Sequence, residues 1–134
     1  VATEFKDLLK TDINTAYASV VGTQKHTALT FASGDHVKPT IEMLDMIAGG
    51  EGKFLERPFA HGGGCTVVSP LRYGTDNCEV AVASIEMNAP VWVVIAPQSG
   101  ATSPAALAGS LVQVIAETLA SLLLIDLICS IISS

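Results

Sequence analysis

The chain has few charged and few aromatic side chains for its length of 134 residues. Charged residues make up 15% of it and aromatic residues 5%, whereas hydrophobic residues reach 49%. An average soluble domain carries about 25% charged residues, so we expect much of this surface to face other protein. Seven basic residues against thirteen acidic ones give a net charge of -6. This balance argues against a nucleic-acid partner, because binding phosphates requires clusters of Lys and Arg.

The chain also lacks the cysteine and histidine patterns of a disulfide-rich or metal-binding protein. Its cysteines are odd in number, with no C-x-x-C pair and no secretory leader before them: Cys65, Cys78 and Cys129. Its histidines show no ligand spacing such as H-x-x-x-H: His26, His36 and His61. We therefore expect free thiols in a reducing, cytoplasmic compartment and no metal held by the protein itself.

The most informative segment is residues 89–120, which predicts a βα unit. The continuous apolar run 91–95 indicates a strand covered on both faces, as in a parallel sheet. Ser103 as N-cap and Pro104 at the first helical position predict the start of a long helix. Ligands of parallel α/β folds bind beyond the carboxyl ends of the strands, so we expect function in the loop 97–101.

Two earlier units repeat this theme. The first has a strand at 27–32 and a helix that opens near Pro39 and stops at Gly49 and Gly50. The second has a strand at 65–68 and a helix whose start is marked by Asp76 and Glu79, spaced as in a capping box. Each strand is followed by a helix, at a period of roughly 30–40 residues.

One more helix is predicted before the first strand. Asp12, Asn14 or Thr15 can cap it, and it ends near Lys25 and His26. The segment Gly62-Gly63-Gly64 precedes the predicted strand 65–68 instead of following a strand. It therefore lacks the context of a phosphate-binding loop, and we interpret it as a flexible connection.

Three successive βα units are too few for a closed barrel, which needs about 250 residues. We therefore predict an α/β chain forming about three of the eight units of a TIM-type (β/α)8 barrel, with residues 1–134 as one segment and no internal boundary. A small open sheet of flavodoxin-like type is the weaker alternative, since it requires a more polar outer helix face. The apolar stretch 116–132 is interrupted by Glu117 and Asp126, which favours a helix without its neighbours over a membrane span.

Several blocks of the chain resemble the trimethylamine methyltransferase family over about residues 12–128. The blocks are GDHVKPTIEMLDMIAGGEGKF, SPLRYGTDNCEV and APQSGATSPAALAG. Members of this family are about four times longer, so the resemblance implies an internal fragment of their barrel. The final segment CSIISS departs from the family, which usually turns there through a Pro-Gly loop, so we expect a truncation or frameshift.

The resemblance also implies an activity. Family members move a methyl group from a methylated amine, such as trimethylamine or a betaine, to the cobalt of a reduced corrinoid. That corrinoid (cobalamin) is carried by a separate small protein, so no cofactor is expected on this chain. The alternative is a truncated, non-catalytic α/β fragment that acts as an interaction or self-associating module, because its apolar edges would seek a partner or a homo-oligomer.

Candidate residues facing substrate or corrinoid lie in the loops after the three strands. They are Asp35, His36, Arg72, Tyr73, Gln98, Ser99 and Gly100. Arg72 and Tyr73 could order a carboxylate-bearing substrate or touch the corrinoid, although ordinary ion pairing is the alternative role for Arg72. For Asp35 and His36 the alternative is helix capping with a solvated imidazole. The loop 98–101 is expected just before a helix N-terminus, where an anion could bind.

Overall fold

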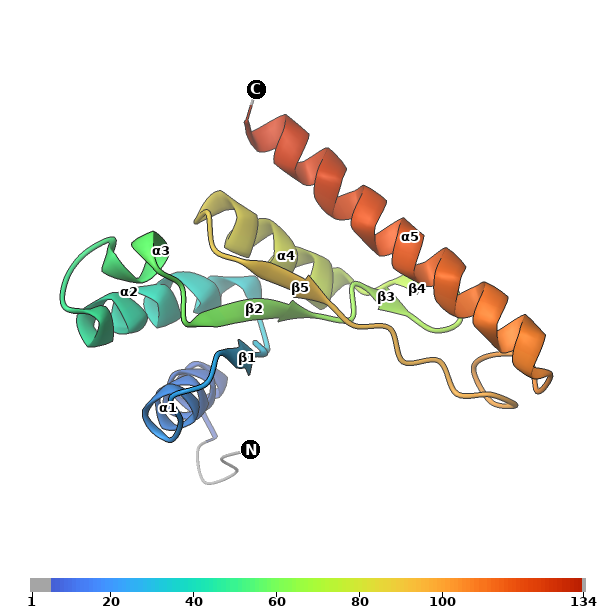
Figure 1. The fold of residues 1–134 in the computed structure, drawn as a ribbon, viewed down its shortest axis with the longest axis horizontal. Helices are drawn as coiled ribbons and strands as arrows, with labels where there is room; N and C mark the ends of the chain where they lie inside the picture. Colours follow the sequence, from blue (N-terminus) through green and yellow to red (C-terminus); the bar gives the residue numbers. More distant parts are fainter. Residues whose placement is uncertain (1–5, 134) are drawn as a thin grey trace.

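The computed structural model describes residues 6–133 as an α/β fold (Figure 1). Its helices are α1 (Leu8–Val21), α2 (Val37–Ala48), α3 (Lys53–Glu56), α4 (Thr75–Glu86) and α5 (Leu107–Ile132), with a 3-10 turn η1 (Gly34–His36) before α2. Its strands are β1 (Thr27–Leu29), β2 (Ala60–Gly64), β3 (Val67–Val68), β4 (Arg72–Tyr73) and β5 (Val91–Val93). The order of strands and helices confirms the predicted alternation.

The main sheet has three parallel strands in the order β1-β2-β5. Thr27 lies beside Ala60 in the first pair of strands, and Gly62 lies beside Val91 in the second. Helix α2 lies between β1 and β2 in the chain, and α4 lies between β2 and β5. Parallel neighbours need such crossovers, so the mixed α/β class with a parallel sheet is confirmed. A closed barrel requires more strands than the three of this sheet.

The core lies on one face of this sheet, under α2, α3 and α4. Leu29 and Ala60 face it from the strands, and Leu44 and Phe54 face it from the helices, all at most 5% exposed. The opposite face stays partly open, since His61 and Trp92 are half-buried. The prediction that strand 91–95 is covered on both faces is therefore wrong for the described residues, because Val91, Trp92 and Val93 of β5 are all only half-buried.

The second strand of the parallel sheet lies five residues earlier than predicted. Strand β2 consists of residues AHGGG, so the three glycines form the central strand and no flexible connection. The predicted strand at 65–68 is in fact a turn into β3, which pairs with β4 as an antiparallel hairpin. Gly62 is needed at its position because a Cβ there would lie 2.9 Å from the Phe31 ring. Sterics of the neighbours thus outweigh the low β-propensity of glycine.

The helix boundaries follow the sequence only in part. Gly49 ends α2 in the left-handed conformation, at φ 105°, as predicted. Helix α1 is capped by the Asp7 carboxylate, which accepts from the Leu9 amide at 3.0 Å, and it ends at Val21. The predicted cap at residues 12–15 and the predicted end near residues 25–26 are therefore wrong.

The predicted caps of the two later helices are also wrong. Helix α4 begins at Thr75 after Gly74, with no side-chain cap, so the Asp76 and Glu79 pair makes no capping box. Helix α5 begins at Leu107, because Ser103 is buried and turns its hydroxyl toward Ser110 instead. For Ser103, a hydrogen bond to a residue farther along the chain replaces the predicted capping role.

Helix α5 reverses the usual distribution of polar and apolar side chains. Its fully buried residues are Ser110, Glu117 and Ser121. Its exposed side carries large apolar residues, among them Leu107, which is 82% exposed, and Leu119, which is 60% exposed. Among the described helices, α5 is the one long and apolar enough to cross a membrane by length and composition, a test that core helices of soluble proteins also pass.

Candidate functional site

Two segments converge on α5, one beyond strand β2 of the parallel sheet and one beyond strand β5. The first, residues 69–73, comprises the turn and strand β4 of the β3–β4 hairpin, in which Val68 lies beside Arg72. The second, residues 97–103, follows β5 (Figure 1). We call them the hairpin loop and the β5 loop. Both occupy the place that the sequence predicts for function, beyond the carboxyl ends of parallel strands.

Glu117 fixes the hairpin loop to α5. Its carboxylate accepts from the Ser69 hydroxyl at 2.6 Å and from the Leu71 amide at 2.9 Å. A third donor is the Gln113 amide, at 2.9 Å. Burial raises the pKa of Glu117, but these donors lower it by more, so the pKa lies below its ordinary value and the carboxylate stays charged. The side chain is 1% exposed and satisfied by neutral donors.

The β5 loop is held by its own turn and by Gln113. The Gln98 carbonyl accepts the amides of Ala101, Thr102 and Ser103. The Gln113 side-chain amide donates to the Thr102 carbonyl at 2.7 Å. The prediction that residues 98–101 lie just before a helix N-terminus is wrong, because α5 starts farther along the chain, at Leu107, and the Ala101 amide donates to the Gln98 carbonyl.

Three serine hydroxyls close the base of the β5 loop. The Ser110 hydroxyl donates to the Pro104 carbonyl at 2.8 Å. Because a hydroxyl has one proton, Ser99 and Ser103 must donate to Ser110, each at 2.7 Å. The predicted residue Ser99 thus orders the loop, while Gly100 supplies the left-handed turn at φ 82° and Gln98 stays exposed.

Arg72 and Tyr73 occupy strand β4 and are exposed. The Tyr73 hydroxyl donates to the Ala120 carbonyl of α5 at 3.1 Å. This bond adds a second attachment of the hairpin to the helix. Arg72 is therefore the residue of this pair that presents a charged group at the loop surface.

Asp35 and His36 belong to a separate cluster after β1. The Asp12 carboxylate accepts from His36 Nδ1 at 2.7 Å and from the Ala32 amide at 2.8 Å. His36 is therefore no solvated imidazole, because Asp12 from α1 fixes its orientation and the proton on Nδ1. The sequence predicts Asp12 only as a helix cap, so this partner was missed.

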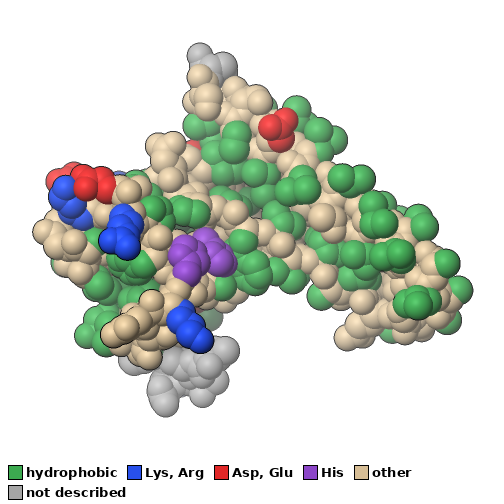
Figure 2. Space-filling model, viewed as in Figure 1, with side chains coloured by type: hydrophobic (Ala, Val, Ile, Leu, Met, Phe, Trp, Pro, Cys, Tyr) green, Lys and Arg blue, Asp and Glu red, His purple; other side chains and the backbone are tan. Residues whose placement is uncertain are grey.

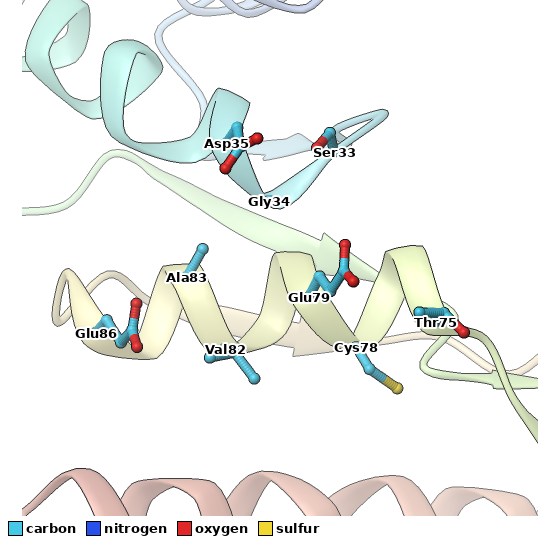
Figure 3. A pocket seen from close by; sticks show the side chains of 9 residues that line it. All are labelled: Ser33, Gly34, Asp35, Thr75, Cys78, Glu79, Val82, Ala83 and Glu86. Carbon is cyan, nitrogen blue, oxygen red and sulfur yellow. The ribbon is translucent and has the colours of Figure 1, made fainter.

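Asp35 lies at a surface hollow between η1 and α4 (Figure 3). Glu79 and Glu86 line the same hollow, together with the Cys78 thiol. Burial raises the pKa of Cys78, and its thiol donates to the Thr66 carbonyl at 3.7 Å, so it is a poor nucleophile. Helix α4 lies between Asp35 and α5 (Figure 3). All three cysteines are free and half-buried.

The open sheet face carries a pair of histidines, His26 and His61, whose separation by 35 positions gives no ligand spacing in the sequence. His26 Nε2 and His61 Nδ1 are 2.7 Å apart, and the His61 and Trp92 ring centroids are 5.3 Å apart. Figure 2 shows the histidine cluster exposed at the surface, with apolar side chains around it. The Trp92 indole nitrogen is buried and has no hydrogen-bond partner in the structure. Within residues 6–133, no three side chains are arranged to hold a metal ion.

Comparison with known proteins decides the family. Residues 4–130 match the model of the family described as trimethylamine methyltransferase (MTTB). The chain belongs to this family. The resemblance seen in the sequence is thereby confirmed, and both loops on α5 lie within the matched residues.

Two relatives show how much of a family member this chain represents. It is 34% identical to a trimethylamine methyltransferase of Desulfitobacterium hafniense over 105 residues, which cover 78% of the chain and 21% of that protein. It is 27% identical to a trimethylamine methyltransferase of Methanosarcina thermophila over 116 residues, which cover 87% of the chain and 24% of that protein. The chain spans about a quarter of the length of these relatives or less.

Proposed function

We propose that this chain is part of a methyltransferase that moves a methyl group from a methylated amine to the cobalt of a corrinoid protein. The observation that carries the proposal is the family match over residues 4–130. Both relatives are described as trimethylamine methyltransferases. The donor in this proposal is trimethylamine or a betaine, and the acceptor is a corrinoid on a separate cytoplasmic protein.

The proposal includes an arc of a (β/α)8 barrel. Three parallel strands with their helices on one face support it, because a barrel covers the outer face of its sheet with helices. In this arrangement the half-open face with His61 and Trp92 points inward. The exposed apolar side of α5 then packs against neighbouring units, which accounts for its composition.

The transfer itself is a displacement at carbon. A corrinoid cobalt would accept the methyl group as the carbon–nitrogen bond breaks, and nitrogen would keep the electron pair. A quaternary betaine would leave directly as a neutral amine, whereas trimethylamine would have to carry a proton on its nitrogen to leave as neutral dimethylamine. The protein has to hold the nitrogen, the methyl group and the cobalt in line and keep water out. Strand-end loops of the barrel would carry out this positioning.

Among the candidate residues, Arg72 is assigned the role of binding a carboxylate-bearing substrate. Its guanidinium is exposed at the hairpin loop, and such a group binds a carboxylate with two parallel hydrogen bonds. Tyr73 and Ser99 are assigned to holding the loops, since their hydroxyls bond to α5. The remaining candidates are assigned to shaping the surface of the loop in which each one lies: Asp35 and His36 after β1, and Gln98 and Gly100 after β5.

Methyl transfer should be measured with the full-length polypeptide that carries this sequence and a reduced corrinoid protein, with trimethylamine and a betaine as donors. Formation of methyl-cobalt is followed by the visible spectrum of the corrinoid. With a betaine as donor, Arg72→Ala should raise KM about tenfold or more, because it removes a charge-assisted hydrogen bond.

The matched control is Lys38→Ala, which removes an exposed basic residue in the first turn of α2. It should leave KM unchanged. Absence of methyl transfer from both donors in the wild-type protein would overturn the proposal. The alternative of a non-catalytic interaction module is not favoured, because the match to the methyltransferase family spans nearly the whole chain.

A further inference from the structure

The polar side of α5 forms one continuous stripe. Ser110, Gln113, Glu117 and Ser121 are spaced by three or four residues and therefore share one face of the helix. Ser110 receives the β5 loop, and Glu117 receives the hairpin loop. Gln113 stands between them. The only acidic group fully buried among the described residues thus lies where two loops meet.

A contribution to stability does not by itself explain why a carboxylate is buried at position 117. Burying a carboxylate without a cation is costly, and a well-packed apolar side chain is often at least as stabilising at such a place. The surroundings of Glu117 supply three neutral donors, so the charge is compensated by geometry and not by an opposite charge. An arrangement of this kind fixes the positions of its donors.

Gln113 extends the connection to the second loop. Its amide nitrogen donates both to the Thr102 carbonyl and to the Glu117 carboxylate. A carbonyl and a carboxylate can only accept, so the nitrogen must face both. One amide group therefore joins the β5 loop to the acid that holds the hairpin loop.

We propose that Glu117 and Gln113 form a relay that sets the two strand-end loops relative to each other, so that Glu117 is a positioning residue for the methyl-transfer site. The assignment to that site rests on the proposed function. The relay connects Ser69 and Leu71 with Thr102, more than thirty residues farther along the chain. Movement of either loop is thereby coupled to the other.

Backbone hydrogen exchange tests the relay directly. In Glu117→Ala, the amides of Leu71 and of residues 101–103 should exchange about tenfold faster or more, because the donors around residue 117 lose their acceptor. In Glu117→Gln, exchange should stay close to wild type. The new carbonyl can accept from Leu71 and Gln113, and the new amide can donate to Ser69.

Two further variants sharpen this test. Gln113→Leu should accelerate exchange in the β5 loop and leave Leu71 protected, which decides the question even if Glu117→Ala does not fold. Ser121→Ala is the control, since this buried hydroxyl donates only to the Glu117 carbonyl within its own helix. Its exchange pattern should match wild type in both loops.

An increase in Glu117→Ala that is confined to the hairpin loop, or that spreads equally over β1, β2 and β5, would overturn the relay. The functional role has its own measurement in the full-length polypeptide. There, Glu117→Ala should lower kcat, and Glu117→Gln should restore it. If the wild type transfers methyl groups and Glu117→Ala keeps its kcat although both loops loosen, the positioning role is wrong. If the wild type transfers none, the proposed function fails while the exchange result still stands.

Discussion

Individual polar side chains in this protein find their partners far along the sequence. His36 bonds to Asp12, and Ser69 bonds to Glu117 across 48 positions. Local spacing predicts helix caps and exposed loops for such residues, because the backbone amides of a nearby helix end are the only hydrogen-bond partners that a few neighbouring positions reveal. The sequence therefore locates the loops that carry Arg72 and Gln98 but does not reveal which side chains hold them.

The His26–His61 pair should make stability depend on pH. Burial lowers the pKa of His61 from 6.5, and repulsion from His26 lowers it further. The unfolded imidazole takes up a proton near pH 6.5 while the folded one does not, so the unfolded state binds more protons below that pH. Stability should therefore fall as the pH drops below about 6.5.

Urea unfolding at pH 7.5 and pH 5.5 measures this effect. The wild-type midpoint should decrease between the two values, and His61→Gln should show a smaller decrease. His36→Gln serves as the control for the loss of a histidine elsewhere in the chain, because this residue lies with Asp12 outside the pair. Equal decreases in wild type and His61→Gln would contradict the assignment.

At the scale of elements, β2 shows how neighbours can override propensity. Glycine is unfavourable in strands, yet three glycines in a row form the central strand of the sheet. Neighbouring residues explain two of them, since Phe31 and Trp92 fill the space that a Cβ on Gly62 and on Gly63 would need. No periodicity within residues 60–64 carries this information, so the strand was predicted at 65–68 instead.

Gly63 is the position where this constraint is strongest. Its φ is 141°, and a Cβ would collide with the Trp92 backbone. Gly63→Ala should lower the free energy of unfolding by about 2–4 kcal/mol, since strain and overpacking add. Chemical denaturation measures this difference.

The neighbouring Gly64→Ala is a matched control in the same strand. Its Cβ would approach Asn77 Oδ1 only to 3.4 Å, so the change should cost less than about 1 kcal/mol. If both variants lose the same stability, the crowding at Trp92 is not the cause.

At the scale of the whole molecule, the main feature is the large apolar surface on the exposed side of α5. Leu111, Leu119, Leu123 and Ile131 are each more than half exposed, and Figure 2 shows apolar side chains over much of the surface. A contiguous apolar surface of this kind is typical of an interface. The isolated 134-residue chain should therefore associate with itself in the absence of other partners.

Light scattering after size exclusion tests this expectation. The wild-type chain should elute at more than the mass of one chain, and Leu119→Glu with Leu123→Glu should shift it toward the monomer. Met46→Glu is the control, because it places a carboxylate on an exposed apolar position of α2 instead of α5. A monomeric wild-type chain would contradict the expectation that this surface is covered by protein.

The sequence by itself determined the α/β class, the parallel sheet, the glycine stop after α2 and the family. These follow from apolar runs, helix-ending glycines and contiguous motifs, all of which are local in the chain. Only the tertiary structure decided the position of β2, the partners of His36 and the inverted polarity of α5. In each case the deciding contact joins segments far apart in sequence, so packing and the need to satisfy buried polar groups chose among local alternatives.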